Sequence, residues 1–122
     1  MPPSPTQDTG HRFETRAALW LEEQGLCVLE RNLLCRAGEI DLVALDGEVL
    51  VFVEVRHRGS ASHGGAAASV NRRKQQRLLR AAGYFLPRLT KYHLGGRHPR
   101  CRFDVVCLEA GNIQWIRHAF TQ

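Results

Sequence analysis

The chain has 122 residues, 43% of them hydrophobic, and a formal net charge of +5. This length and composition suit one domain with one hydrophobic core. No apolar run approaches the length of a membrane span and no internal repeat is visible, which excludes a helical membrane protein and a repeat array.

The first ten residues, MPPSPTQDTG, are polar and rich in proline, without the apolar core of a signal peptide. We therefore expect a disordered lead-in over residues 1–9 and a single domain over residues 10–122. None of the four cysteines belongs to a CxxC pair, and three lie in apolar runs typical of strands. This favours reduced thiols in a cytoplasmic protein over the alternative of a structural zinc site.

Charge is distributed unevenly along the chain. Residues 1–54 hold ten acidic and four basic side chains, whereas residues 55–103 hold twelve Lys or Arg and no Asp or Glu. An acid-free segment of this length predicts a surface for a polyanion, and nucleic acid is the leading candidate. A membrane surface is the alternative, but no strongly hydrophobic amphipathic segment accompanies the basic residues.

The first predicted element is an amphipathic helix over residues 10–24. Thr9 or Asp8 is the expected cap, and Gly25 is the expected stop. Glu14 lies at the edge of the buried stripe. The stripe itself is expected to contain Phe13, Ala17, Trp20 and Leu21.

Three strands are predicted next, over residues 26–35, 39–45 and 48–56. The dipeptide Asp46-Gly47 between the last two is the strongest short-range signal of a β-hairpin. Both faces of this hairpin carry apolar residues. One face holds Ile40, Leu42, Val49, Val51, Val53 and Val55, and the other holds Val43, Leu45, Leu50 and Phe52. A sheet that is apolar on both faces is covered on both, which predicts helices packed on a mixed sheet.

The same hairpin gathers acidic side chains. If Leu45 pairs with Glu48, Glu54 lies opposite Glu39, and strand alternation places Glu39, Asp41, Glu54 and Arg56 on one face. Opposed like charges repel, so three carboxylates need a divalent cation, basic partners or solvent. A three-residue loop would shift the register by one and weaken this prediction. The alternative is a set of ordinary exposed acids at the end of a sheet.

A loop over residues 57–69 follows the acidic strand directly, with His57 and His63 as candidates for substrate contact or for a general base. The alternative is that both histidines are simply exposed. A second helix is predicted over residues 70–86, with an apolar arc of Leu78, Leu79, Ala82, Phe85 and Leu86. Gln75 falls inside this arc and needs a partner, either at the metal site or in the loop backbone. The candidate nucleic-acid contacts are Arg72, Arg73, Lys74, Arg77 and Arg80 on the opposite side, together with Arg58 on the preceding strand.

The remaining sequence predicts a basic loop over residues 88–101 and two final strands. These strands are RFDVVCLE and NIQWIRHAF, joined by a turn at Ala110-Gly111. The predicted order of elements is therefore α-β-β-β-α-β-β.

Several motifs together resemble the YraN-like family of small, largely uncharacterised bacterial proteins. They are the helix with Glu14, GEIDLV, VFVEVR, KQQRLLRAAGYFL and RFDVV, and the resemblance covers roughly residues 10–120. That family is similar to the PD-(D/E)xK nuclease superfamily, with the core of restriction endonucleases and Holliday-junction resolvases. The resemblance implies an α/β fold in which helices flank a mixed central sheet with a restriction endonuclease-like core.

The resemblance also implies roles for single residues. Asp41 matches the first metal-binding acid of the superfamily core, and Glu54 matches the second. Glu14 matches an acid on the first helix that completes the metal shell in some relatives. The role of Glu39 stays open, and we expect Asp104 to pair with a nearby basic group.

One position departs from the superfamily pattern, which has lysine two residues after the second acid. This chain has Arg56 there. Arginine is not deprotonated in proteins, so Arg56 cannot be a general base. It can still bind a phosphate oxygen and stabilise charge that develops at phosphorus.

We therefore predict a metal-dependent endonuclease that hydrolyses phosphodiester bonds, with DNA expected before RNA and branched or structured DNA as the leading substrate. Asp41, Glu54 and Glu14 would hold Mg²⁺ or Mn²⁺, and Asp41, Glu54 and Arg56 would act in catalysis. The first alternative is a nucleic-acid-binding module with a degenerate site. An adaptor that contacts proteins through its basic helix is the second alternative, and a homodimer is left open.

Overall fold

The computed structural model describes residues 5–58 and 70–121, and for residues 5–10 and 58 it describes the backbone alone. Seven elements follow one another, in the predicted order. They are α1 (Pro5–Glu23), β1 (Cys27–Cys35), β2 (Gly38–Asp46), β3 (Val49–Arg58), α2 (Arg72–His93), β4 (Arg100–Glu109) and β5 (Asn112–Phe120).

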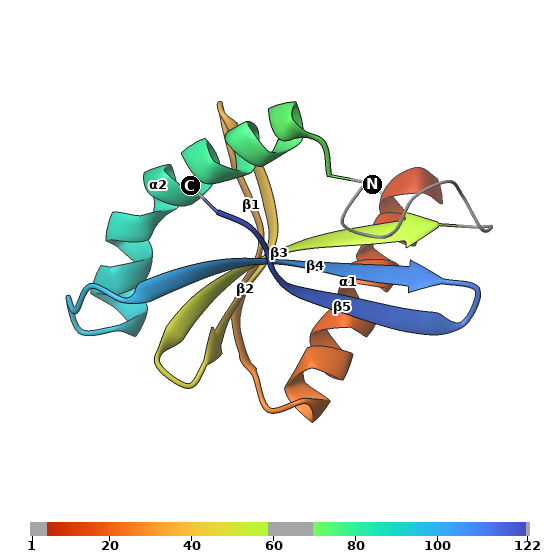
Figure 1. Cartoon of the computed structure of the whole chain (residues 1–122), viewed down its shortest axis with the longest axis horizontal. Helices are drawn as coiled ribbons and strands as arrows, with labels where there is room; N and C mark the ends of the chain where they lie inside the picture. Colours follow the sequence, from red (N-terminus) through yellow and green to blue (C-terminus); the bar gives the residue numbers. More distant parts are fainter. Residues whose placement is uncertain (1–4, 59–69, 122) are drawn as a thin grey trace.

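The five strands form one sheet in the order β1-β2-β3-β4-β5. Neighbouring strands are antiparallel except for β3 and β4, which are parallel. A parallel pair needs a long crossover connection, and α2 is part of that connection. The two helices lie on opposite sides of the sheet (Figure 1). The predicted mixed sheet with flanking helices is therefore confirmed.

Each face of the sheet has its own hydrophobic cluster. The cluster under α1 includes Ala17, Leu21, Leu42, Val51, Val53 and Val106. The cluster under α2 includes Val43, Leu50, Phe52, Leu78, Phe85 and Leu89. The central strands are thus buried on both sides, as the apolar residues on both faces of the hairpin predicted.

The helix α1 begins at Pro5, five residues before its predicted start. Proline is well tolerated at a first helical position, because the N–H that it lacks has no partner there. Asp8 and Thr9 lie inside the helix, so the prediction that either is its cap was wrong. At the other end, Gly25 has a φ of +101°, and the predicted stop is confirmed.

The β2–β3 hairpin has a different register from the predicted one. Asp46 pairs with Val49, so the two loop residues are Gly47 and Glu48. Gly47 has a φ of +62°, and a positive φ at the first loop residue is the pattern of a type II′ turn. The register moves by two residues, which keeps the side-chain faces but removes the predicted pairing of Glu54 with Glu39.

Ile40 is the exception to the predicted faces of the hairpin. It packs in the cluster under α2, whereas Leu42, two residues later, packs in the cluster under α1. Strict alternation is therefore broken between these two residues. The paired ladder of β2 and β3 ends at the same place, with Leu42 opposite Val53.

The helix α2 continues to His93, so the predicted loop over residues 88–101 was wrong at residues 88–93. Pro87 lies inside the helix, which costs roughly 3 kcal/mol at an interior position. Leu89 is fully buried, and burial of one leucine contributes about 1.5–3 kcal/mol. Thr90 Oγ1 also donates to the Pro87 carbonyl over 2.9 Å. Both interactions offset the cost of the proline.

Asp104 on β4 is paired as predicted. Its side chain is buried and accepts hydrogen bonds from Arg102, from Trp115 Nε1 and from the His118 backbone N–H, at 2.9–3.0 Å. The Arg102 guanidinium also contacts Asp46 at 3.0 Å. This network joins the last two strands to the β2–β3 hairpin.

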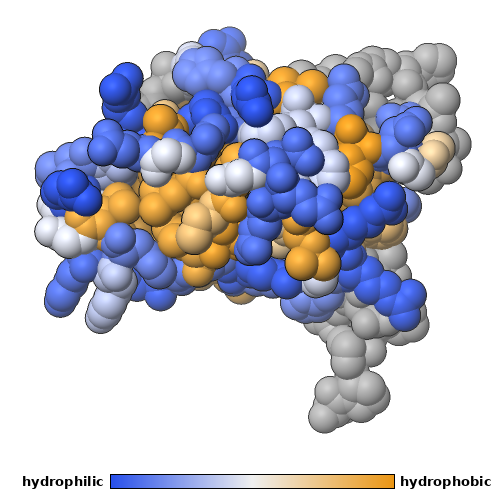
Figure 2. Space-filling view, turned by 90° about the horizontal axis from the view of Figure 1, so that it is seen from below, coloured by the Kyte–Doolittle hydropathy of each residue, from blue (hydrophilic) through white to orange (hydrophobic). Residues whose placement is uncertain are grey.

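The side of the molecule away from α2 carries apolar side chains in its middle, bordered by hydrophilic ones (Figure 2).

The described helices include none that is long and apolar enough to cross a membrane. All four cysteines are free thiols in the structure.

Candidate metal and nucleic-acid site

Three carboxylates from α1 and β2 meet at one end of the sheet. Glu14, Glu39 and Asp41 each offer an oxygen, and these oxygens lie within 4.8 Å of one another. The sequence predicted that Glu14 and Asp41 share a site. It left the role of Glu39 open, and the structure brings this residue into the same group.

Asp41 is held in place by the backbone of β3. Its Oδ2 accepts a hydrogen bond from the Val55 N–H over 2.8 Å. This bond replaces a ladder bond where the pairing of β2 and β3 ends. The break in alternation on β2 thus turns Asp41 towards Glu14 of α1, while its carboxylate stays fixed on β3.

Glu54 approaches the cluster from the other face of the sheet. Its side chain is buried, and its Oε1 lies 3.4 Å from Arg56 Nε and 3.6 Å from Lys74 Nζ. It also hydrogen-bonds to Asp41. Glu54 is therefore adjacent to the group of Glu14, Glu39 and Asp41, and is not a member of it.

Burial raises the pKa values of Glu54, Asp41 and Glu14, so these three acids are harder to ionise when no cation is bound. Desolvation, followed by the charge of Asp41, raises the pKa of Glu54 from 4.5 to about 8. Desolvation likewise raises the pKa of Asp41, although the Val55 N–H opposes the shift. Desolvation and the charges of Asp41 and Glu39 raise the pKa of Glu14. Each shift favours a proton or a metal ion at the cluster.

Two buried oxygens, one in the group and one on the adjacent Glu54, have no hydrogen-bond partner among the described residues. They are Glu14 Oε1 and Glu54 Oε2. Buried polar atoms without partners are rare in native structures, and a bound ion, a bound water or a functional role commonly accounts for them. Carboxylate oxygens are also the ligands that Mg²⁺ and Mn²⁺ prefer. The residues present therefore fit a divalent cation.

Sequence reasoning missed two residues of this site. Lys74 was placed among the nucleic-acid contacts of the helix, but its ammonium lies beside Glu54. Asn32 was not singled out, yet it hydrogen-bonds to Glu14 and has a φ of +55°. Asparagine tolerates this left-handed conformation better than most residues do. An Asn inside an apolar strand was the available signal.

Other predicted residues lie at the rim of the site or outside it. His57 stacks on Phe13, with ring centroids 3.7 Å apart. Gln75 donates to the Val70 carbonyl over 3.0 Å, so its partner is the loop backbone and not the metal site. His63 and the Arg58 side chain lie outside the described residues.

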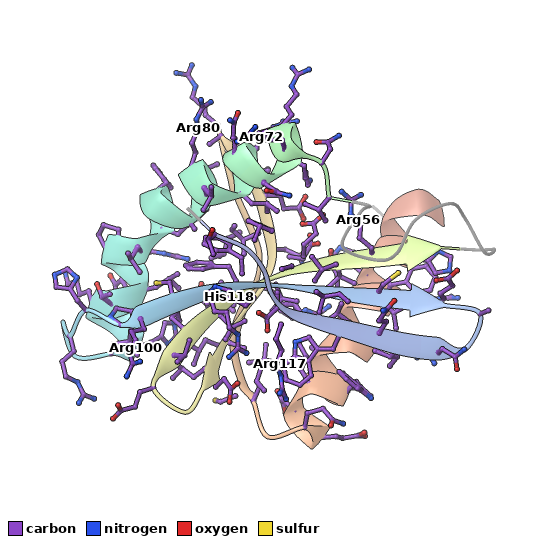
Figure 3. The ribbon with its side chains drawn as sticks, viewed as in Figure 1. Arg56, Arg72, Arg80, Arg100, Arg117 and His118 are labelled. Atoms are coloured by element: carbon purple, nitrogen blue, oxygen red, sulfur yellow. The ribbon has the colours of Figure 1, made fainter. Side chains whose placement is uncertain are left out.

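The basic side chains of α2 mostly point away from the sheet. Arg72 and Arg80 extend outward from the helix, whereas Arg56 lies between the end of β3 and the start of α2 (Figure 3). Arg73 and Arg77 are also exposed. Of the five predicted contacts on α2, Lys74 alone contacts one of the site acids, Glu54, and the other four are exposed on the helix.

A family model described as "Uncharacterised protein family UPF0102" matches residues 13–108. The chain belongs to this family. It is the YraN-like family that the motifs of the sequence resemble. The matched region contains all four site acids and the whole of α2.

Bacterial UPF0102 proteins match over nearly the whole chain. The relative from Bordetella parapertussis is 57% identical over 117 residues, which are 96% of this chain and 66% of that protein. The relative from Alcanivorax borkumensis is 50% identical and covers 93% of this chain and 92% of its own length. The chain thus spans slightly less than two thirds of the Bordetella protein. No activity is named in either description.

Proposed function

We propose that this UPF0102 protein is a metal-dependent nuclease that hydrolyses phosphodiester bonds in nucleic acid. The observation that carries the proposal is the group of Glu14, Glu39 and Asp41 beside the buried Glu54. Two oxygens of these four acids are buried without a hydrogen-bond partner among the described residues, and two cations lie next to Glu54. Acids that hold a metal ion and cations that hold phosphates are the two parts that such a reaction needs.

Each residue has a task in this proposal. Glu14, Glu39 and Asp41 would hold Mg²⁺ or Mn²⁺, and Glu54 would complete the shell through its free Oε2. When bound, the ion supplies a polarised phosphate and an activated water. The Val55 N–H keeps Asp41 oriented, as donors around metal ligands commonly do.

The two cations next to Glu54 are suited to the phosphate. Arg56 offers a planar fork of donors that can bind two phosphate oxygens at once. Lys74 offers a compact ammonium, which binds as a point charge. Together they would neutralise charge that develops at phosphorus in the transition state. This chain lacks the superfamily's lysine on β3, and Lys74 of α2 would supply an ammonium beside Glu54 in its place.

A nucleic-acid-binding module without catalysis is the second candidate. The arginine at position 56 favours it, because the superfamily pattern has lysine there. The two candidates share the basic surface and differ in the chemistry of the acids. Only a cleavage assay separates them.

The experiment is a cleavage screen with Mn²⁺ over single strands, duplexes, flaps and four-way junctions. We expect cleavage by the parent, none by Glu54→Gln, and preserved or increased cleavage by Arg56→Lys. Glu48→Gln, an exposed acid in the β2–β3 turn, is the matched control and should cut like the parent. If the parent and Arg56→Lys bind every substrate but cut none, the binding module replaces the nuclease.

A further inference from the structure

Two neighbouring hollows lie between the β1–β2 turn and the first turns of α2. The first, of about 240 Å³, is lined by residues that include Arg36, Gly38, Glu39, Lys74 and Arg77. The second, of about 380 Å³, is lined by Arg36, Ala37, Arg73, Gln76, Arg77 and Arg80. Arg36 and Arg77 line both, so the two hollows are adjacent, and we call them together the turn groove.

One end of the turn groove opens onto the acidic cluster. Glu39 lines this end and belongs to the carboxylate group, and Lys74 lines it and contacts Glu54. The other end reaches Arg80 on the outer face of α2 (Figure 3). At 1.5 Å per residue, the helix advances about 9 Å from Lys74 to Arg80. This corresponds to about two or three nucleotides of one strand.

The walls of the groove are held together. Arg77 Nε donates to the Ala37 carbonyl over 3.4 Å. A Cβ on Gly38 would lie 3.6 Å from Arg77, so the turn packs directly against the helix. The turn and the helix that carry the arginines are thus fixed relative to each other, so binding a ligand between them would not require these two elements to be ordered first.

The charge of the groove is unbalanced. Within the described part of the chain, no ion pair is formed by its four arginines, Arg36, Arg73, Arg77 and Arg80. Glu39 is the one acid among the lining residues, and none of them is aromatic. Guanidinium groups bind phosphate well, and without an aromatic ring the groove has no platform for stacking bases.

We infer that the turn groove binds the sugar-phosphate backbone of one nucleic-acid strand, on one side of the bond that faces the acidic cluster. The inference rests on the proposed function and extends it with a strand path and one new contact residue, Arg36 of the β1–β2 turn. Recognition through phosphates makes this binding independent of base sequence.

The test compares two charge-matched double variants. Arg36→Gln/Arg80→Gln removes two cations from the groove, and Arg97→Gln/Arg100→Gln removes two exposed arginines from a hollow of about 320 Å³ at the opposite end of the sheet. Fluorescence anisotropy with a labelled 20-nucleotide single strand measures affinity across a salt series. We expect the groove variant to bind at least about tenfold more weakly at low salt. The slope of log affinity against log salt concentration should be about 1.4 shallower for this variant, because it has lost two phosphate contacts. The affinity of the control variant should differ from that of the parent by less than twofold.

Cys35 provides a second readout in the unmodified protein. It lines the groove, whereas Cys27 at the other end of β1 is exposed and distant from it. The oligonucleotide should slow alkylation of Cys35 by iodoacetamide and leave alkylation of Cys27 unchanged, as read by mass spectrometry.

The groove and the proposed nuclease can fail separately. The groove would be overturned as a binding site if both double variants bound the oligonucleotide equally weakly. It would also be overturned if Cys35 were alkylated equally with and without the oligonucleotide. Suppose that the groove variant loses affinity, the control variant does not, and the parent cuts no substrate with Mn²⁺. This result would support the groove and overturn the nuclease. Manganese binding by the groove variant, measured by calorimetry, should equal that of the parent, because its two residues are not metal ligands.

Discussion

Without metal, the parent protein should become less stable as pH rises. The substitution Glu54→Gln should remove most of this pH dependence. Burial raises the pKa of Glu54 from 4.5 to about 8, so the folded protein holds a proton that the unfolded chain releases near pH 4.5. Below that pH both states are protonated and no stability is lost. Between these values the unfolded state binds fewer protons, and stability falls as pH rises.

The size of the effect follows from the same interval. About 3.5 pH units at 1.36 kcal/mol each correspond to a loss of about 5 kcal/mol, complete once the pH exceeds about 8. A neutral glutamine has no such loss, because it is uncharged at every pH. We therefore expect Glu54→Gln to be more stable than the parent by several kcal/mol at pH 8, and close to it at pH 4.5.

Urea denaturation at pH 4.5, 6, 7 and 8, with a metal chelator, measures this difference as the free energy of unfolding. The control is Glu48→Gln, whose side chain is exposed and whose curve should run parallel to that of the parent. If the parent and Glu54→Gln keep a constant difference across this range, Glu54 is not a buried acid with a raised pKa.

Three further predictions concern the scaffold, each measured by urea denaturation. Pro87→Ala should stabilise the protein by about 1–3 kcal/mol, because it restores the helical N–H and removes the ring from the middle of α2; destabilisation would show that the proline is required there. Asp104→Asn should destabilise it by about 3 kcal/mol, since Arg102 would lose its buried charge partner; a change below 1 kcal/mol would contradict this. Gly83→Ala should stabilise α2 by about 0.5–1 kcal/mol, because a methyl group there meets no atom within 4 Å. Gly47→Ala should destabilise the hairpin, because alanine is strained at the φ of +62° that this position has. Equal effects of the two substitutions on stability would refute the contrast.

The order of helices and strands could be predicted from the sequence. So could the face of the sheet to which most side chains of the hairpin point. Periodicity and the apolar character of both hairpin faces carried this prediction, since both are local properties of the chain. The register of the hairpin was not predictable in the same way. Asp46-Gly47 and Gly47-Glu48 are both acceptable two-residue loops, and the choice between them keeps every side chain on its face.

The candidate site was predicted in its composition and not in its geometry. The break in alternation near Asp41 depends on the bond from Val55 and on the packing of Ile40 under α2, which are contacts between distant residues. Lys74 reaches Glu54 because of the way α2 packs on β1 and β2 next to β3, and no spacing in the sequence encodes that packing. The helix beyond Pro87 was missed for a similar reason, since tertiary burial of Leu89 offsets a local cost.

The proposed metal site is tested most directly by calorimetric titration of the parent and of Asp41→Asn with Mn²⁺ near neutral pH. The asparagine keeps an oxygen that can accept the Val55 N–H, but it removes the charge from the centre of the cluster. We expect saturable binding of manganese by the parent, accompanied by proton release, and binding at least about tenfold weaker in the variant. Equal binding of manganese by the two proteins would contradict it.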